Sequence, residues 1–461
     1  MSTKHMPADS ETTMSNNTNS INSTDKEKAQ DLTSQFSSTH KAAIVALLSF
    51  IGFLATFSST AILPAVPNIA DDLKTTQVAV NIGNAVYVAL LGFPTIFWGQ
   101  MARHCGRRPP VLIALVIYTL ANLATSFSPE IASFTVFRIL AALEATCFLV
   151  VGASICGDLY VVTERATAIG YFIFGIFVGT GVGPLITGAI ITTSTWRWIF
   201  WSQTACLFIV TVLTYFYLPE TVGVRESRFR DFSALERAKK IASWLSPVST
   251  IKLYKYPGIL FTSIASGALL WGMYSILTPI RQVLNPRFGL TTPLQSGLLY
   301  LAPGAGYLIG CPLAGKWSDY MVKRWKKKTS GVARPEDRLR ATLVPFLLNA
   351  ASTLIYGWSV EKKKGGMAVP IIFLFLSAFA QMACFSPISA YSVDVIPGRG
   401  SEVLAANYLL RYSAGAAGTA AVLPVIGIIG IGWFSTLSAG LIFVSTALMV
   451  VAIYCPKKWH P

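Results

Sequence analysis

Apolar residues dominate this chain in long blocks that are separated by short polar segments. Six blocks lie in the first half of the sequence and six in the second. Each block is about 20 residues long, the length of helix that crosses the hydrocarbon core of a bilayer. The pattern therefore predicts twelve membrane-spanning helices, at 42–63, 77–98, 110–127, 132–156, 167–191, 198–218, 259–280, 294–314, 341–359, 368–391, 403–427 and 430–454.

The polar segments divide the chain into domains. Residues 1–41 are rich in Ser, Thr and Asn, which predicts a disordered tail. Residues 42–218 and 259–455 each predict a six-helix bundle, and residues 219–258 predict the linker between them. A short second tail, 456–461, ends the chain.

The basic residues fall mainly on one side of the predicted membrane. With the N-terminus inside, 28 of the 37 Lys and Arg residues lie in cytoplasmic segments and 7 lie on the opposite side. The positive-inside rule describes this asymmetry, so we expect both tails and the linker in the cytoplasm. The net charge of +16 then reflects membrane orientation and lipid contact, and we expect no nucleic-acid partner.

The composition also limits the chemistry. Charged residues make up 13% of the chain, against roughly 25% in soluble domains. The seven cysteines lack paired spacing, and the four histidines lie in tails or loops. We therefore expect no metal site, no cofactor and no enzymatic activity. The sequence has no Gly-Lys-Ser/Thr phosphate loop, which argues against ATP-driven transport.

The fifth block is unusually rich in glycine. Gly175, Gly179 and Gly183 recur every fourth residue, Pro184 follows directly, and Gly188 lies one turn further on. A helix face without side chains lets another backbone approach closely, and a proline removes a helix hydrogen bond. We expect this helix to slide or flex against a neighbour. The alternative is that glycine is simply more frequent in membrane helices.

Several motifs resemble those of the major facilitator superfamily. The run from Gly99 to Pro109 is similar to the family's loop 2–3 motif, and the run from Gly179 to Gly188 to the fifth-helix motif of its proton-driven antiporters. Five further pieces resemble the fungal branch of twelve-span drug:proton antiporters: Arg138 with Gly157 to Tyr160, Trp196 to Trp201, Leu218 to Thr221, Pro335 to Leu339, and Asn407 to Arg411. The resemblance covers roughly 42–455. It implies an all-α membrane protein of the major facilitator fold, with two pseudo-symmetric six-helix bundles.

The chain departs from the family pattern at two places. Arg103 stands where the family usually has an acidic residue, which implies a weakened or rewired latch in the first half, while the second half keeps Asp319. Ala141 and Ala142 replace the usual Gln-Gly after the arginine of helix four. The usual coupling geometry is therefore in question.

Charged residues within or beside the spans are candidates for function, because a charge at mid-membrane is costly. Arg138 and Glu144 lie in the fourth span and are candidates for proton coupling. The alternative is that Arg138 reaches to the outer interface and Glu144 is structural. The resemblance implies a cytoplasmic gate, and its expected members are Gly99, Arg107, Arg108, Asp158, Arg165, Asp319 and Arg411.

Polar and aromatic residues inside the spans are candidates for the wall of a substrate cavity. They are Asn81, Asn84, Tyr87, Trp271, Tyr274, Tyr300 and Gln381. Polar groups in membrane spans tend to face the bundle interior, and aromatic walls suit flat or cationic organic molecules. The alternative is hydrogen bonding between helices.

Together these features predict a plasma-membrane transporter. We expect a monomer that exports small organic compounds, such as drugs and xenobiotics, in exchange for protons by alternating access. Two alternatives remain open. One is a proton-coupled exporter of a single metabolite, such as an organic acid, an amino-acid derivative or a polyamine. The other is a membrane sensor that keeps the fold but does not transport.

Overall fold

The computed structural model describes residues 37–160, 162–221, 248–290, 292–328, 334–396 and 400–454. The predicted tail 1–41 and the predicted linker 219–258 lie largely outside these residues, and the predicted tail 456–461 lies entirely outside them. The described residues form helices joined by short turns.

The described residues of the first half form nine helical segments. They are α2 (Ser38–Thr60), η1 (Leu63–Ala65), α3 (Val66–Asp72), α4 (Gln77–Leu90), α5 (Thr95–His104), α6 (Arg108–Ser126), α7 (Ile131–Leu159), α8 (Val162–Thr193) and α9 (Arg197–Tyr217). Helices α4 and α5 together cover the predicted span 77–98, and α5 continues beyond it to His104. They are separated by a turn that includes Gly92 and Pro94.

The second half follows the same plan. Its segments are α12 (Val248–Lys252), η2 (Leu253–Lys255), α13 (Pro257–Leu277), η3 (Ile280–Leu284), α14 (Asn285–Phe288), α15 (Pro293–Leu299), α16 (Leu301–Lys328), η4 (Pro335–Thr342), α17 (Leu343–Glu361), α18 (Ala368–Asp394) and α19 (Gly400–Tyr454).

The described residues contain 11 helices that are long and apolar enough to cross a membrane. The last, α19, is two helices joined across Gly430, whose backbone is not helical (φ 80°, ψ 165°). The Glu361 carboxylate accepts hydrogen bonds from the backbone N–H groups of Ile431 (3.0 Å) and Gly432 (3.3 Å), and so caps the second part. Counting both parts gives twelve crossings, which confirms the predicted number.

Helix α16 extends well beyond its predicted span. The sequence pattern ended that span at residue 314, but the helix continues to Lys328. Its last turn contains Lys326, Lys327 and Lys328, which are good helix formers and interact favourably with the negative end of the helix dipole. Hydropathy finds only the part of a helix that lies in lipid, so it misses such a polar extension.

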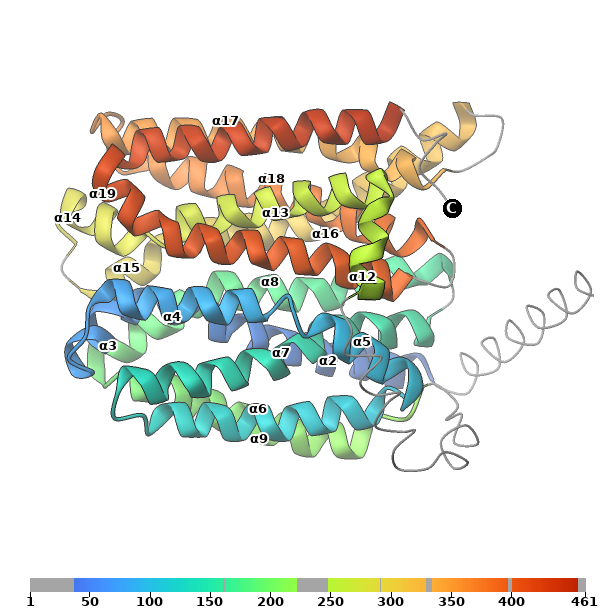
Figure 1. The fold of residues 1–461 in the computed structure, drawn as a ribbon, viewed down its shortest axis with the longest axis horizontal. Helices are drawn as coiled ribbons and strands as arrows, with labels where there is room; N and C mark the ends of the chain where they lie inside the picture. The colour runs from blue at the N-terminus through green and yellow to red at the C-terminus, as the bar shows by residue number, and fades with distance from the viewer. Residues whose placement is uncertain are drawn as a thin grey trace, which may run out of the picture.

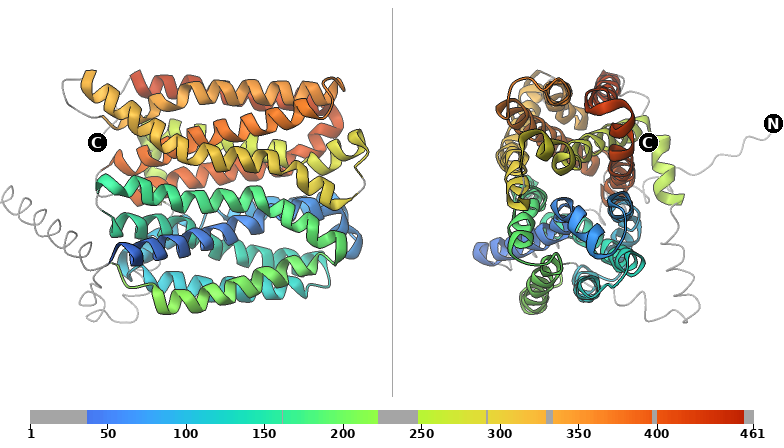
Figure 2. Two further views of the ribbon diagram at one scale, coloured as in Figure 1. Left: turned by 180° about the vertical axis from the view of Figure 1, so that it is seen from behind. Right: turned by 90° about the vertical axis from the view of Figure 1, so that its left-hand side faces the viewer.

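The two halves lie side by side with their helices roughly parallel (Figure 1). The view along the helices separates the first-half bundle, coloured blue to green, from the second-half bundle, coloured yellow to red (Figure 2). Large apolar side chains face outward, among them Phe216 (74% exposed), Val344 (71%) and Ile428 (83%). Such an apolar exterior suits a lipid environment, and the chain is a multi-pass membrane protein.

The glycine face of α8 lies against α2 within the first half. A methyl group at Gly175 would collide with the backbone of Ser49, and one at Gly179 with the backbone of Phe53. The hydroxyl of Thr56 donates to the carbonyl of Ile176 at 2.5 Å, which ties the two helices together. The repeat therefore serves a close helix pair inside one bundle.

A different glycine of α8 makes the contact between the halves. The backbones of Gly181 and Gly304, on α16, are so close that a Cβ on either would meet the other residue's Cα. One turn away, a Cβ at Gly297 would lie 3.0 Å from the carbonyl oxygen of Pro184. No side chain separates α8 from α15 and α16 at this point, so the halves meet backbone to backbone.

Candidate functional site

A cavity lies between the two halves and is lined by both. It encloses about 650 Å³ of space between atoms, with the part open to solvent included. Its first-half wall comes from α2, α7, α8 and the turn after α4, and its second-half wall from α13, α18 and α19. The lining residues are Thr56, Ser59, Leu91, Leu149, Ile173, Ile176, Phe177, Thr180, Leu270, Met273, Tyr274, Phe385, Ser386, Ser389, Tyr408, Arg411 and Tyr412.

The lining is aromatic and rich in hydroxyl groups, with a single charge. Phe177 and Phe385 stack across the boundary between the halves, with ring centroids 5.9 Å apart. Among the lining residues that the structure describes, Arg411 alone has a charged side chain, and none is Asp or Glu. The cavity is therefore amphipathic and positive.

Arg411 is 6% exposed and is held by neutral groups. Its Nε donates to the hydroxyl of Ser266, and its Nη2 donates to the hydroxyl of Ser389 at 3.5 Å. The guanidinium lies over the ring of Phe385 (4.3 Å to the centroid) and near that of Tyr408 (5.0 Å). Sequence analysis placed Arg411 in a cytoplasmic gate. The structure places it in the wall of the central cavity.

Arg138 is the corresponding buried cation of the first half, but it does not line the cavity. Its Nη1 donates to the Ser58 hydroxyl (2.6 Å) and its Nη2 to the Asn84 side-chain oxygen (3.2 Å). The guanidinium centre lies 3.8 Å from the centroid of the Tyr87 ring. With 1% exposure it is enclosed by protein. The alternative that Arg138 reaches to the outer membrane interface is therefore wrong.

Glu144 lies on a different face of α7 from the cavity. It is five residues from Leu149, which lines the cavity, so the two lie about 140° apart around the helix axis. Glu144 is 7% exposed, and its Oε2 has no hydrogen-bond partner among the described residues. It is a buried titratable group that is not among the described residues of the cavity wall.

The other residues that were predicted to line the cavity lie at different places in the structure. Tyr274 lines the cavity and donates to the Ser59 hydroxyl across the halves (3.3 Å). Asn81 bonds within its helix, Trp271 donates to Ser438, and Tyr300 donates to the carbonyl of Leu277. The side-chain oxygen of Gln381 is buried without a partner in the described part of the chain. Of the seven candidates, only Tyr274 lines the cavity.

Contacts between the halves lie on both sides of the cavity along the helix direction. Toward the end formed by α3 and α14, Arg281 Nη1 donates to the Asn68 side-chain oxygen (3.1 Å). Toward the opposite end, the Thr95 hydroxyl donates to the carbonyl of Ala405 (3.4 Å). These hydrogen bonds join the two halves on either side of the cavity.

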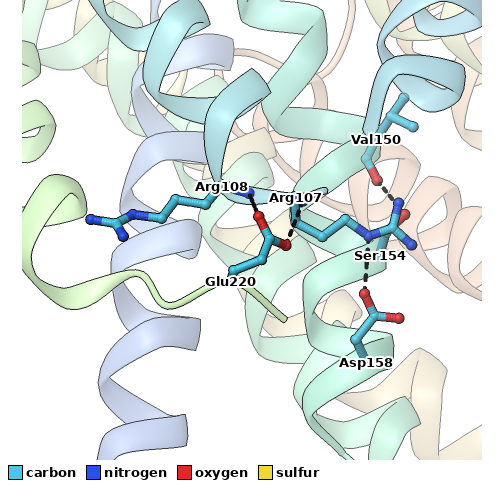
Figure 3. A network of polar contacts seen from close by, with 6 residues as sticks. All are labelled: Arg107, Arg108, Val150, Ser154, Asp158 and Glu220. Carbon is cyan, nitrogen blue, oxygen red and sulfur yellow. Dashed lines mark hydrogen bonds and ion pairs between the residues drawn. The ribbon is translucent and has the colours of Figure 1, made fainter. Parts of the chain in front are cut away.

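At the end of the molecule near the start of α6, charged residues form a compact cluster (Figure 3). Arg107 Nε makes an ion pair with Asp158 at 3.0 Å, which joins the turn before α6 to the end of α7. Arg108 Nη2 donates to the carbonyl of Tyr215 at 2.6 Å, which joins α6 to α9. Three helices of the first half are thus tied together. Burial raises the pKa of the neighbouring Cys105 thiol, which keeps it neutral.

Glu220 completes this cluster and was not among the predicted gate residues. Its carboxylate accepts from the backbone N–H groups of Arg107 (2.7 Å) and Arg108 (3.1 Å), at the N-terminus of α6. Gly106 has a φ of +87°, and a Cβ there would collide with this carboxylate. The sequence motif from Leu218 to Thr221 contains Glu220 and could have drawn attention to it. The motif did not reveal its partners, because Arg107 and Arg108 lie more than 100 positions away in the sequence.

The remaining gate candidates are only partly described. The side chains of Arg103, Arg165 and Asp319 lie outside the described part of the structure. Gly99 lines a small second pocket with Glu402 and Thr250, which brings α5 near α12 and α19. No group of three or more His, Cys, Asp or Glu side chains suited to a metal occurs among the described residues.

Comparison with known proteins gives one consistent family. The sequence profile of the Major Facilitator Superfamily matches residues 48–419. Multidrug transporter DTR1 of Candida glabrata is 26% identical over 92% of this chain and 86% of its own length. Citrate exporter 1 of Aspergillus niger is 25% identical, over 92% of this chain and 87% of its own.

A solved structure shares the fold at lower sequence identity. The human organic anion transporter MFSD10 (TETRAN) superposes with a TM-score of 0.68 at 15% identity, covering 89% of this chain and 99% of that one. This likeness shows the fold alone.

Proposed function

The chain belongs to the Major Facilitator Superfamily, and we propose that it exports small organic compounds in exchange for protons. Membership makes it a membrane transporter and not an enzyme. The observation that carries the proposal is the cavity shared by the two halves, with contacts between them on both sides. Opening either set of contacts in turn would expose the cavity to one side of the membrane and then to the other.

Two features support movement of the halves against each other. Gly181 and Gly304 meet without intervening side chains, so no interlocked side chains need to rearrange at this contact. The Arg107–Asp158 ion pair and the Glu220 cap hold the first half together at one end, so that it moves as a unit. Small shifts of such rigid bodies are enough for alternating access.

Glu144 is the candidate proton carrier of the proposal. It is buried in the fourth span, and one of its oxygens has no partner among the described groups. A proton drives transport only if it binds one orientation more tightly than the other. We propose that protonation of Glu144, on α7, has this differential effect and that the buried Arg138 modulates it.

The proposed setting is the plasma membrane, with both termini in the cytoplasm and a monomeric protein. The distribution of Lys and Arg supports this orientation. In that orientation the Arg107–Asp158 cluster belongs to the cytoplasmic gate.

The second candidate is a dedicated exporter of one metabolite. The similarity to a protein named Citrate exporter 1 is as extensive as the similarity to a multidrug transporter. A non-transporting sensor is the third reading, and it predicts no substrate movement at all.

The test is substrate-driven proton movement in proteoliposomes that contain the purified chain. A pH-sensitive dye inside the vesicles reports proton flux when candidate compounds are added to an imposed pH gradient. Proton flux that depends on both protein and compound supports antiport. Compound counterflow without proton flux removes the coupling from the proposal, and the absence of both favours the sensor.

A further inference from the structure

The charge of the central cavity is unbalanced. Of the described residues that line it, Arg411 alone is charged, and the other side chains are apolar, aromatic or hydroxyl-bearing. The acidic residue of α19 nearest in sequence, Glu402, lines the separate second pocket. No carboxylate among the lining residues offsets the guanidinium.

The contacts of Arg411 leave part of its guanidinium free to bind another group. Nε and Nη2 donate to the hydroxyls of Ser266 and Ser389, and the structure records no hydrogen bond from Nη1 within the described residues. The rings of Phe385 and Tyr408 hold the plane of the group in place. A guanidinium fixed in this way presents a planar fork of donors that matches a carboxylate or sulfonate.

A second buried cation adds to the same field. Arg138 donates to Ser58 and Asn84, both neutral, and Ser58 precedes the lining residue Ser59. Two guanidinium groups without a recorded carboxylate partner in the described structure make this region positive. In a low-dielectric interior, such charge is costly unless an anion compensates for it.

From these contacts we infer that the cavity binds a small organic anion, whose carboxylate or sulfonate group pairs with Arg411 and whose body packs against the rings of Phe177 and Phe385. The inference rests on the proposed transport function and names its substrate class. Cations, including polyamines, are disfavoured because the wall offers them no opposite charge. The hydroxyls of Ser59, Ser386 and Tyr274 suit polar substituents on the anion.

The test uses matched probes that differ only in charge. We would measure equilibrium binding to the full-length chain in lipid nanodiscs for benzenesulfonate, benzenesulfonamide and benzyltrimethylammonium, and for the corresponding naphthalene compounds. Wild-type protein is expected to bind the sulfonates most tightly. Arg411→Gln should weaken sulfonate binding by on the order of tenfold to a hundredfold, the range expected for hydrogen bonds to a charged group, and should leave binding of the sulfonamides unchanged.

Two further variants make the outcome specific. Arg411→Lys keeps the charge without the planar fork and should lose less sulfonate affinity than Arg411→Gln. Lys252→Gln removes an exposed positive charge from α12, far from the cavity wall, and should bind like wild type. If Arg411→Gln does not fold, the Arg411→Lys result decides, because unchanged sulfonate affinity in that variant contradicts pairing by the fork.

The results separate this inference from the transport proposal. Tighter binding of the cations than of the sulfonates, or equal sulfonate affinity in wild type and Arg411→Gln, overturns the anion assignment. Counterflow of a cation or sulfonamide in proteoliposomes would then leave transport standing. No sulfonate binding in either series also overturns the assignment.

Discussion

The two buried arginines of this protein occupy different environments, although both lie within membrane spans. Arg138, in the first half, is enclosed by Ser58, Asn84 and the ring of Tyr87 and has no place in the cavity wall. Arg411, in the second half, lines the cavity. Burial of an arginine within a membrane span therefore does not by itself define its role. One arginine organises the interior of its bundle, and the other faces the space where a substrate would bind.

The largest expected effect tests the structural role of Arg138. Arg138→Met should destabilise the protein by roughly 2–4 kcal/mol, because Ser58 and Asn84 lose their charged donor while buried. The measurement is reversible unfolding in mixed micelles. A change below about 0.5 kcal/mol, the usual range for surface substitutions, would mean that these hydrogen bonds do not hold the bundle together.

Arg411→Met is the matched variant in the other half. Its stability should change by less than about 1 kcal/mol, because Ser266 still donates to the Asn407 side-chain oxygen and Ser389 borders the cavity, so neither hydroxyl is left buried without a partner. Transport, however, should be lost for any substrate that pairs with the guanidinium. If Arg411→Met destabilises the protein as much as Arg138→Met, the distinction between the two arginines is wrong.

Glu144→Gln tests whether the first half also carries the proton. The variant should keep wild-type abundance and lose proton-linked export, measured as dye-reported proton flux in proteoliposomes. Glu144 and Arg138 lie about 120° apart around α7, so they are not an obvious intrahelical pair. Normal coupled export by Glu144→Gln would remove this residue from the mechanism.

The smallest expected effect concerns the two carboxylates that cap helices at opposite ends of the molecule. Glu220→Gln should cost about 1 kcal/mol, because each of its two carboxylate oxygens accepts one backbone N–H and an amide keeps only one acceptor oxygen. Glu361→Gln should cost less, because one oxygen, Oε2, accepts both N–H groups of its cap. Only Glu220→Gln should also increase labelling of Cys105 by a thiol reagent, since Glu220 holds the turn beside it. Equal labelling in both variants would contradict a local role for Glu220 in closing that end.

The sequence predicted the fold well because lipid imposes a simple rule on length and polarity. Twelve crossings followed from twelve apolar blocks, and the burial of Arg411 followed from its position inside one of them. For Arg138 the sequence left a position at the outer interface open as an alternative. The sequence pattern did not predict how each helix is rotated about its own axis. Arg411 faces the cavity and Asn81 does not because of packing between helices that are far apart in the sequence. The pairing of Glu220 with the turn at Gly106 likewise depends on how α6, α7 and α9 end together.

Distances between spin labels at both ends of the molecule test most directly whether the two halves open alternately around the shared cavity. One label pair, at Ala42 and Lys323, would report the end with the Arg107–Asp158 cluster, and another, at Lys74 and Lys362, the opposite end. Both pairs would be measured in nanodiscs at several pH values, with and without a bound sulfonate. If the two halves open alternately, the distance at one end lengthens as the distance at the other end shortens. Distances that stay fixed, or that change together, would contradict it.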